Sequence, residues 1–281
     1  MKIVAGIILY NPNLDTLKKS IQALSGIVDK IILVDNASDN IDDVRKIAKR
    51  KSVSLIKNKE NLGVAEALNI LMENAFKMHA TNLLTLDQDS IIDKKMIPKM
   101  EKYLISSEVA IVCPRFVDIN KKKQRKVKSE IEYEYVNRCI TSGSVMNLPI
   151  CNKIGRFDAS MFIDYVDFDY CKRIQLAGYK IIRVNSCELT HAIGKRSSRK
   201  FFWIDVYPTN HSVKRVYYFT RNLRYYLLKY KGQFSLKELI NERVIATWKT
   251  LSIVLYEDDK KEKLKAIRKA KKDAKIMAEG K

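Results

Sequence analysis

The sequence predicts an α/β fold in which helices flank a mostly parallel central sheet, with a helical extension at the C-terminus. Three observations lead to this prediction. β-rich and amphipathic segments alternate through the first 118 residues, as in βαβ proteins. Polar residues directly follow four of the β-rich segments. The chain from Lys195 to Lys281 carries 23 basic and 9 acidic residues and reads mainly as helix.

The elements of the first part follow from hydrophobic periodicity. The apolar run at 3–10 predicts a strand, and the segment after it repeats leucine and isoleucine at helical spacing. That helical face consists of Leu14, Leu17, Ile21 and Leu24. The helix at 61–78 has an inner face of Val64, Leu68, Leu71 and Ala75. The other predicted elements are strands at 30–38, 53–58, 82–89 and 109–118 and a polar helix at about 42–51.

The rest of the chain has a different character. A small, polar segment at 141–149 precedes a helix that begins near three aspartates and ends near Gly178. The basic segment at 194–200 predicts a loop. A helix rich in tyrosine and arginine follows at 212–232, and a lysine-rich helix is predicted at 258–281. We find no internal repeat.

Composition limits the possible functions. A net charge of +21 on 281 residues favours polyanionic partners, namely nucleic acid, anionic lipid headgroups or phosphorylated substrates. The five cysteines show no C-x-x-C spacing, which argues against a zinc site and a disulfide framework and fits a reducing cytosol. The N-terminus does not resemble a signal peptide. The apolar segment at 244–256 is too short to span a bilayer but suits its surface.

The polar residues after the first four strands predict a cleft, because ligands bind at the carboxyl ends of strands in open α/β sheets. These ends carry Tyr10-Asn11, Asp35-Asn36, 58–63 and Asp87-Gln88-Asp89. The carboxylates of Asp87 and Asp89 suit Mg²⁺ or Mn²⁺ bound together with substrate phosphates. Two solvated charges at a strand end are the alternative. Neither of the glycine-rich phosphate-binding motifs occurs, which disfavours a P-loop or standard dinucleotide fold.

Five ordered segments resemble glycosyltransferase family 2, and most closely its bacterial dTDP-rhamnose-dependent rhamnosyltransferases. They read "IVAGIILYNPN", "IILVDNASDN", "NKENLGVAEALNIL", "LTLDQDS" and "MFIDYVDFDYCKR…H". The resemblance implies a GT-A fold over 1–200, with a nucleotide-binding half at 1–118 and an acceptor-binding half at 119–200. The basic helical extension is then 201–281. It also implies an inverting, metal-dependent transfer of a sugar, L-rhamnose from dTDP-rhamnose, to a glycan in surface polysaccharide synthesis.

The resemblance also assigns roles to residues at the strand ends. Asp35 is similar to the carboxylate that accepts the pyrimidine imide N–H. The other residues implied to bind the nucleotide are Tyr10, Asn11, Asn36, Asn61, Gly63, Asn69, Asp87 and Gln88. Asp87-Gln88-Asp89 resembles the family's D-x-D motif, so that Asp89 and Asp87 would bind Mg²⁺ or Mn²⁺. His191 matches a position that completes the metal or diphosphate site in some relatives.

The catalytic base of the family lies in an acidic pair that opens a helix. Here the pair reads Val166-Asp167, with valine in place of the usual glutamate, which leaves Asp167 as the expected base. The alternative explanation for the aspartates near the start of this helix is structural, because negative charges interact favourably with a helix N-terminus. Residues expected near the acceptor or the diphosphate are Asp164, Ser142, Gly143, Lys195 and Arg196, the last two in a basic loop that covers the diphosphate or is simply solvated.

Other functions stay open at this stage. A UDP-sugar donor, carrying a hexose or galactofuranose, is the nearest alternative. A nucleotidyltransferase would need a basic, glycine-rich loop where this chain reads "YNPNLD". A nucleic-acid-binding protein fits the charge, but only 213–232 interleaves basic and aromatic residues, and we expect no specific nucleic-acid partner. We expect a cytoplasmic protein, peripheral on the inner face of an anionic membrane, with a lipid-linked acceptor. The sequence leaves the oligomeric state open.

Overall fold

The computed structural model describes residues 1–118, 131–191, 199–201, 204–206 and 208–280. The chain divides into two compact units. The first unit consists of Met1–Phe162 and Val166–His191, and the second of Ile163–Tyr165 and Ala192–Lys281. A three-residue segment in the middle of the chain therefore belongs to the C-terminal unit, although the residues on both sides of it belong to the first.

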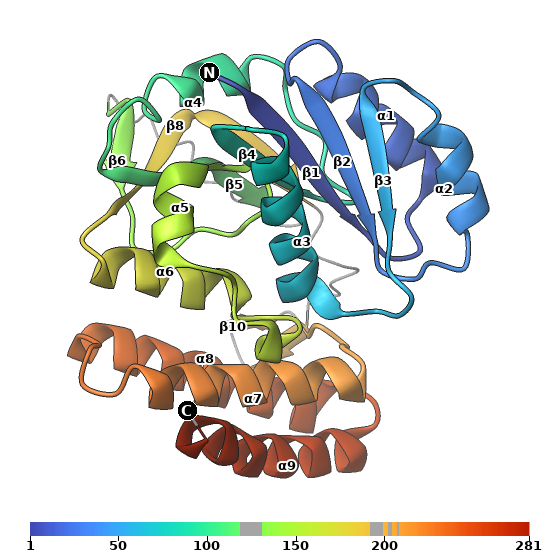
Figure 1. Ribbon diagram of the computed structural model, residues 1–281. Coiled ribbons are helices and arrows are strands. Elements are labelled where there is room, and N and C mark those ends of the chain that lie inside the picture. The colour runs from blue at the N-terminus through green and yellow to red at the C-terminus, as the bar shows by residue number, and fades with distance from the viewer. Residues whose placement is uncertain (119–130, 192–198, 202–203, 207, 281) are drawn as a thin grey trace. The chain divides into compact units, whose positions relative to one another are not determined.

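Within the described residues, eight strands of the first unit form one sheet in the order β3-β2-β1-β4-β7-β5-β8-β6 (Figure 1). Their bounds are β1 Ile3–Leu9, β2 Lys30–Asp35, β3 Val53–Lys57, β4 Asn82–Asp87, β5 Val109–Asp118, β6 Tyr133–Tyr135, β7 Ser144–Asn147 and β8 Lys180–His191. Strands β1 to β4 pair in parallel, as do β5 and β8. β7 runs antiparallel to both β4 and β5, and β6 antiparallel to β8. The predicted mostly parallel sheet is confirmed.

Helices cover both faces of this sheet. Alternate residues of β1, including Ile7 and Leu9, share a core with apolar residues of α1, α2 and α4. On the other face Gly6 lets α3 approach, because a Cβ at Gly6 would lie 2.6 Å from a methyl carbon of Leu71. Figure 1 shows α5 and α6 over this same face. The helices are α1 Leu14–Leu24, α2 Ile41–Ile47, α3 Gly63–Lys77, α4 Met96–Glu101, α5 Leu148–Ile154 and α6 Val166–Leu176, with a 3-10 turn, η1, at Ala159–Met161.

The second unit contains a short hairpin, β9 and β10, and three long helices. The bounds are β9 Arg199–Phe201, β10 Ile204–Val206, α7 Val213–Lys229, α8 Leu236–Tyr256 and α9 Lys260–Glu279. Val216, Ile253 and Ile267 bring one side chain from each helix into a common core. A capping box starts α8, since Ser235 and Glu238 each accept a hydrogen bond from the other's backbone N–H. No helix among the described residues is both long enough and apolar enough to cross a bilayer.

Several elements differ from the sequence-based expectation. The apolar segment at 244–256 is only the later part of α8, which begins eight residues earlier, at Leu236. The polar helix α2 ends at Ile47 instead of continuing to about 51. β8, the partner of β5, was not predicted, because its alternating polar residues hide it from a search for apolar runs.

Candidate active site

The carboxyl ends of β1 to β4 lie side by side, as predicted, at one edge of the sheet. The register pairs Leu9 with Asp35 and Ile8 with Asp87, so that these three strands end at the same level. The loops after them are joined by hydrogen bonds. The Tyr10 N–H donates to Gln88 Oε1 (2.8 Å), which links the end of β1 to the end of β4. Tyr10 itself is half exposed.

Asn11 links the β1 end to the loop that follows β2. Its backbone adopts the left-handed conformation (φ 50°), and its N–H donates to Ser38 Oγ (2.8 Å). Its side chain pairs twice with Asp39, accepting from the Asp39 N–H (2.7 Å) and donating to the carboxylate (3.2 Å). The predicted nucleotide-binding residue Asn11 therefore shapes the rim of the site through contacts with its neighbours.

Asp35, the last residue of β2, is fully buried. One carboxylate oxygen, Oδ2, accepts from the Ser38 N–H (3.0 Å) and thereby caps the turn that follows β2. The other oxygen, Oδ1, is buried and has no hydrogen-bond partner among the described residues. A buried, charged acceptor without a donor is costly. The structure thus leaves at Asp35 one acceptor position for a ligand N–H.

Asn36 and Gly63 belong to a buried network between β2, β3 and α3. Asn36 Nδ2 donates to the Gly63 carbonyl (3.2 Å), and Asn36 Oδ1 accepts from Asn58 Nδ2 (2.8 Å). Asn61 Oδ1 accepts from the Gly63 N–H (3.0 Å). Gly63 has φ +82°, and a Cβ there would lie 2.6 Å from the Phe162 carbonyl oxygen. Glycine is therefore required where α3 begins beside the loop that ends at Phe162.

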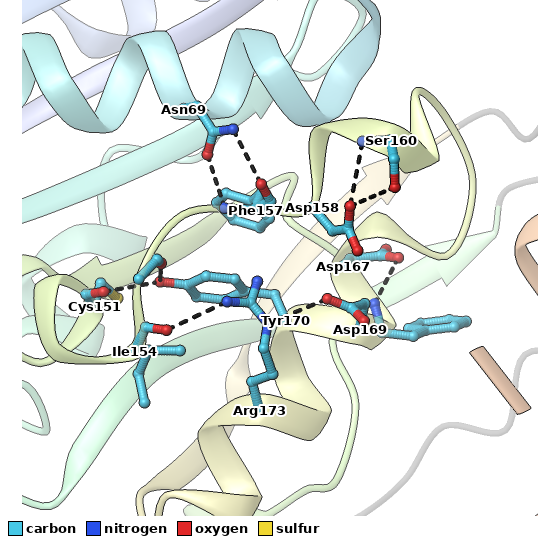
Figure 2. A network of polar contacts seen from close by, with 12 residues as sticks. Asn69, Cys151, Ile154, Phe157, Asp158, Ser160, Asp167, Asp169, Tyr170 and Arg173 are labelled. Atoms are coloured by element: carbon cyan, nitrogen blue, oxygen red, sulfur yellow. Dashed lines mark hydrogen bonds and ion pairs between the residues drawn. The ribbon is translucent and has the colours of Figure 1, made fainter. Parts of the chain in front are cut away.

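Asn69, another residue expected at the nucleotide, is buried in α3 and hydrogen-bonded to the backbone of Phe157. It donates to the Phe157 carbonyl (3.1 Å) and accepts from the Phe157 N–H (2.8 Å), a two-bond pairing visible in Figure 2. The Phe157 ring stacks on Tyr170 of α6 with 4.0 Å between ring centroids. Burial raises the pKa of the Tyr170 phenol far above its usual value, so it stays a donor, bonded to the Gly155 carbonyl (3.1 Å). Asn69 thus connects α3 with α6 through this stack.

The turn after β4 presents the two carboxylates of the D-x-D segment. Asp87 is partly buried and Asp89 is exposed. The turn is held from below, since the Asp87 N–H donates to Ser142 Oγ (3.0 Å), and Ser142 Oγ also lies 2.8 Å from Ser90 Oγ. Ser142 is itself buried. Ser90 is not among the predicted site residues, because a serine after D-x-D gives no local sign of its buried contact with Ser142.

The donor set at this turn fits a hard divalent cation. Mg²⁺ takes one or two carboxylates and leaves its other positions to water and substrate phosphate, and Asp87 and Asp89 supply such a pair at an accessible turn. Among the residues that the structure describes, no cluster of three or more His, Cys, Asp or Glu side chains is arranged around a metal position. The side chain of His191, and both Lys195 and Arg196, lie outside the described residues.

The three aspartates before and within α6 have different surroundings. Asp167 occupies the second position of α6, is partly buried, and accepts from the Phe168 N–H through Oδ1 (2.9 Å). Asp169 is fully buried and pairs with Arg173 (3.2 Å), as Figure 2 shows. Asp164 lies before the helix, in the second unit, and pairs with Arg215 (3.4 Å). Of the three, Asp167 combines partial exposure with a helix N-terminal position.

A small cavity connects Asp167 with the sheet beneath the D-x-D turn. Its lining includes Asp167 and Tyr170 from α6, Thr141 from the segment before β7, and Thr85, two residues before Asp87 on β4. Gly143 lies in the same segment as Thr141 and donates its N–H to the Thr85 carbonyl (2.7 Å). Its φ of +78° and the close approach of Leu189 and Pro114 leave no room for a side chain. The 141–144 segment is thus hydrogen-bonded to β4 and lines the same cavity as Asp167.

Comparison with known proteins identifies the family of the chain. The sequence model of glycosyl transferase family 2 matches residues 5–163, more than half of the chain. A dTDP-rhamnosyl transferase, RfbF, from Shigella flexneri is 29% identical over 277 residues, which cover 94% of this chain and 92% of RfbF.

Two solved structures share the fold at low sequence identity. The mannosyltransferase PcManGT from Pyrobaculum calidifontis, in complex with GDP-Man and Mn²⁺, superposes with a TM-score of 0.61 at 13% identity, covering 99% of this chain and 75% of PcManGT. GalNAc-T7 with UDP, GalNAc and Mn²⁺ gives a TM-score of 0.58 at 13% identity over 87% of this chain. The chain spans 54% of the length of GalNAc-T7. From its sequence motifs, its sheet topology and the family match, the chain belongs to glycosyl transferase family 2.

Proposed function

We propose that this glycosyltransferase moves L-rhamnose from dTDP-rhamnose to a glycan acceptor with inversion at the anomeric carbon, using a bound Mg²⁺ or Mn²⁺. The observation that carries the proposal is the buried Oδ1 of Asp35, an acceptor without a donor at the strand-end rim. Thymine and uracil carry a ring N–H that fits such an acceptor. The similarity to RfbF over nearly the whole chain supports dTDP-rhamnose as the donor.

In this proposal the nucleotide occupies the rim formed by β1 to β4. Asp35 accepts the imide N–H, Tyr10 flanks the base, and Asn11, Asn36 and Asn61 shape the edge of the pocket. Gly63, Asn69, Asp87 and Gln88 complete the nucleotide-binding set. Asp87 and Asp89 hold the cation, which when bound stabilises the negative charge on the departing diphosphate. The nucleotide-binding half is then 1–118 and the acceptor-binding half 119–200.

Asp167 is the proposed base. Its carboxylate takes the proton from an acceptor hydroxyl while the hydroxyl oxygen forms a bond to the anomeric carbon. The bond between that carbon and the diphosphate oxygen breaks on the opposite face, and dTDP leaves with the bonding electron pair. A base at the start of a helix is held in position, and reach matters more here than a shifted pKa. A UDP-linked hexose or galactofuranose is the alternative donor, since UDP shares the imide N–H.

A thermal-shift panel tests the donor class directly. We expect dTDP and UDP, each with Mn²⁺, to raise the melting temperature more than GDP with Mn²⁺ or than either nucleotide without metal. Asp89→Ala should lose the part of the melting-temperature rise that depends on Mn²⁺. Asp35→Ala should lose the preference for dTDP and UDP over GDP. Asp15→Ala, a change to an exposed carboxylate on α1, should behave as wild type. Equal stabilisation by GDP and dTDP would refute the role of Asp35.

Turnover tests the chemistry. We expect Asp167→Asn to bind dTDP with unchanged affinity and to lose transfer activity by about 10²–10⁴-fold, the usual contribution of a general base to the rate. The configuration of the product, read from its anomeric proton coupling by NMR, distinguishes inversion from retention. Full activity of Asp167→Asn would remove Asp167 from the mechanism.

The second unit supports a further part of the proposal, peripheral binding to the cytoplasmic face of an anionic membrane, where lipid-linked acceptors are found. α8 exposes a row of apolar side chains about one turn apart: Leu236, Ile240, Val244 and Trp248. α9 exposes basic side chains at Lys261, Lys265, Arg268, Lys272 and Lys275. We expect the protein to float with phosphatidylglycerol vesicles and not with phosphatidylcholine vesicles. Ile240→Ser combined with Trp248→Ser should reduce flotation without changing the dTDP thermal shift.

A further inference from the structure

The segment Ile163–Tyr165 has an unusual backbone immediately before the helix that carries Asp167. Phe162, Asp164 and Tyr165 all have positive φ angles, of 62°, 64° and 65°. Residues with a Cβ adopt this left-handed conformation only when their surroundings impose it. Val166 and Asp167 follow directly as the first two residues of α6. Positive-φ residues therefore stand directly before α6, and the contacts of the 163–165 segment decide whether this backbone conformation persists.

Asn222 of α7 makes the backbone contacts. Its Nδ2 donates to the Ile163 carbonyl (2.7 Å) and to the Asp164 carbonyl (3.0 Å), so one amide group fixes two successive peptide units. The Asn222 side chain is oriented in turn, because its Oδ1 accepts from Arg221 Nε (3.0 Å). Asn222 is fully buried. A buried polar side chain in the middle of a helix is expensive unless its hydrogen bonds are made, and here they are made to the 163–165 segment.

Glu242 of α8 makes the side-chain contact. Its Oε2 accepts from the Tyr165 hydroxyl (2.5 Å), and the two residues are 0% and 5% exposed. The Tyr165 ring packs against Phe219 and Tyr226 of α7, each with 5.6 Å between ring centroids. A charge-assisted hydrogen bond in a buried, aromatic setting is short and strongly directional. Glu242 thus fixes the position of the residue that stands two places before Asp167.

We infer that Asn222 and Glu242 are positioning residues for Asp167. α7 and α8 hold Asp164 and Tyr165 in the left-handed conformation, and the peptide bond from Tyr165 to Val166 joins these residues directly to the first turn of α6. The carboxylate of Asp167 then lies where it reaches the acceptor hydroxyl. The C-terminal unit thereby acts in the transfer step as well as in any surface binding. This inference rests on the proposed role of Asp167 as the base.

The test removes each of the two contacts with a single substitution. Tyr165→Phe removes one hydroxyl, and Asn222→Asp replaces the donor amide with an oxygen that cannot donate to the two carbonyls. Tyr217→Phe is the matched control, because the Tyr217 hydroxyl also donates to a carboxylate, Asp273, over 2.5 Å in the same unit. The Tyr217 bond joins α7 to α9 and does not touch 163–165.

We expect kcat to fall about tenfold for Tyr165→Phe and about 100-fold for Asn222→Asp, because a displacement near 1 Å of a catalytic group costs about 10² in rate. KM for dTDP-rhamnose and the dTDP thermal shift should stay within twofold of wild type. Tyr217→Phe should keep the wild-type kcat, even if its melting temperature falls as far as that of Tyr165→Phe. Amide hydrogen exchange at Val166, Asp167 and Phe168, followed by mass spectrometry, should quicken in Tyr165→Phe and not in Tyr217→Phe.

The outcomes distinguish a wrong assignment of the base from a wrong positioning inference. If Asp167→Asn keeps its activity, the assignment of the base is wrong and the positioning inference falls with it. If Asp167→Asn is inactive while folded Tyr165→Phe keeps kcat within twofold of wild type, the base stands and the positioning inference is wrong. Equal loss of kcat in Tyr165→Phe and Tyr217→Phe would show that destabilising the C-terminal unit lowers activity in general. This result would also overturn the positioning inference. In the Asp167→Asn background, Tyr165→Phe should reduce the residual rate no further.

Discussion

Ser142 lies 55 residues after Asp87 in the chain, yet its hydroxyl oxygen accepts a hydrogen bond from the Asp87 N–H over 3.0 Å. The same hydroxyl lies 2.8 Å from Ser90 Oγ, so one buried side chain touches both sides of the D-x-D turn. Ser142 was expected near the acceptor or the diphosphate, and its contacts give it a role beneath the turn. Asp89, the proposed cation ligand, is exposed on the turn that Ser142 supports.

Ser142→Ala should therefore weaken both the fold and the cation site. Removing the hydroxyl leaves the Asp87 N–H without its acceptor, which costs about 1–3 kcal/mol of unfolding free energy. We expect the Mn²⁺-dependent part of the dTDP thermal shift to fall as well, because the turn loses its support. Urea unfolding and the shift itself measure the two effects. Ser106→Ala, at an exposed serine, is the control, and an unchanged metal dependence in Ser142→Ala would contradict the prediction.

Gly63→Ala should destabilise the protein far more than Gly178→Ala. Both glycines have nearly the same φ, +82° and +83°. A Cβ at Gly178 meets nothing within 4 Å, whereas one at Gly63 would lie 2.6 Å from the Phe162 carbonyl oxygen. We expect Gly178→Ala to lose about 1–2 kcal/mol, the cost of the left-handed backbone alone. Gly63→Ala should lose at least ~3 kcal/mol, because the contact of α3 with Phe162 must open. Urea unfolding of both variants is the measurement, and equal losses would refute the steric argument.

Lys263→Met should be among the most damaging changes in the second unit. The side chains of Lys263 and Glu257 are 3% and 1% exposed and form an ion pair of 3.0 Å. Removing the Lys263 ammonium leaves the buried Glu257 carboxylate without a counter-charge, which lowers the free energy of unfolding by about 3–5 kcal/mol. Adding Glu257→Gln should recover most of the loss, since a neutral amide oxygen still accepts from the Thr209 N–H (3.1 Å).

The matched control for this pair is Lys269→Met, which breaks an exposed ion pair with Asp273. We expect it to cost less than about 1 kcal/mol, because water already screens such a pair. Circular dichroism during thermal and urea unfolding measures all three proteins. A cost for Lys263→Met as small as that for Lys269→Met would show that the buried pair contributes no more than the exposed one.

Stability should fall as the pH rises above about 8.5. Burial raises the pKa of the Cys151 thiol to about 12, and a neighbouring thiol together with burial raises the pKa of Cys171 well above its usual value. In the unfolded chain these thiols ionise near pH 8.5. Between that pH and the native pKa only the unfolded state loses protons, which favours unfolding.

The urea midpoint measured from pH 7.5 to 10.5 tests this linkage. We expect a decline that begins near pH 8.5, and a shallower decline for Cys151→Ala, which removes one of the titrating groups. The native protein should also react slowly with iodoacetamide at pH 8, because the described cysteines are free but four of the five are buried thiols. Rapid modification of Cys151 in the folded protein would contradict its raised pKa.

The sequence predicted the parts of the fold that depend on local pattern. Leu17, Ile21 and Leu24 face the core as their spacing required, and β1 to β4 end together because parallel strands with short helical crossovers leave little choice. The bounds of β5 and α9 also agree closely with expectation. Periodicity alone was enough for these elements.

The parts that the sequence did not reveal depend on distant partners. β8 reads as an irregular polar segment until its pairing with β5 is known, and nothing local places β7 between β4 and β5. Asn222 and Glu242 look like ordinary polar positions in helices, because their burial comes from a segment about 60 to 80 residues away. For the same reason the sequence could not predict the buried contact of Ser142 with Asp87.

The position of β7 has a consequence for how the chain is made. β4 leaves the ribosome long before Ser144–Asn147, the strand that pairs with its outer edge. Until then the nascent protein presents β4 with a row of unsatisfied backbone groups, the kind of edge that recruits other chains and aggregates. Closing the sheet requires a late, non-local insertion between β4 and β5, which slows folding. During synthesis the edge of β4 therefore stays unpaired until β7 has been made, and in this interval the nascent chain depends most on chaperones.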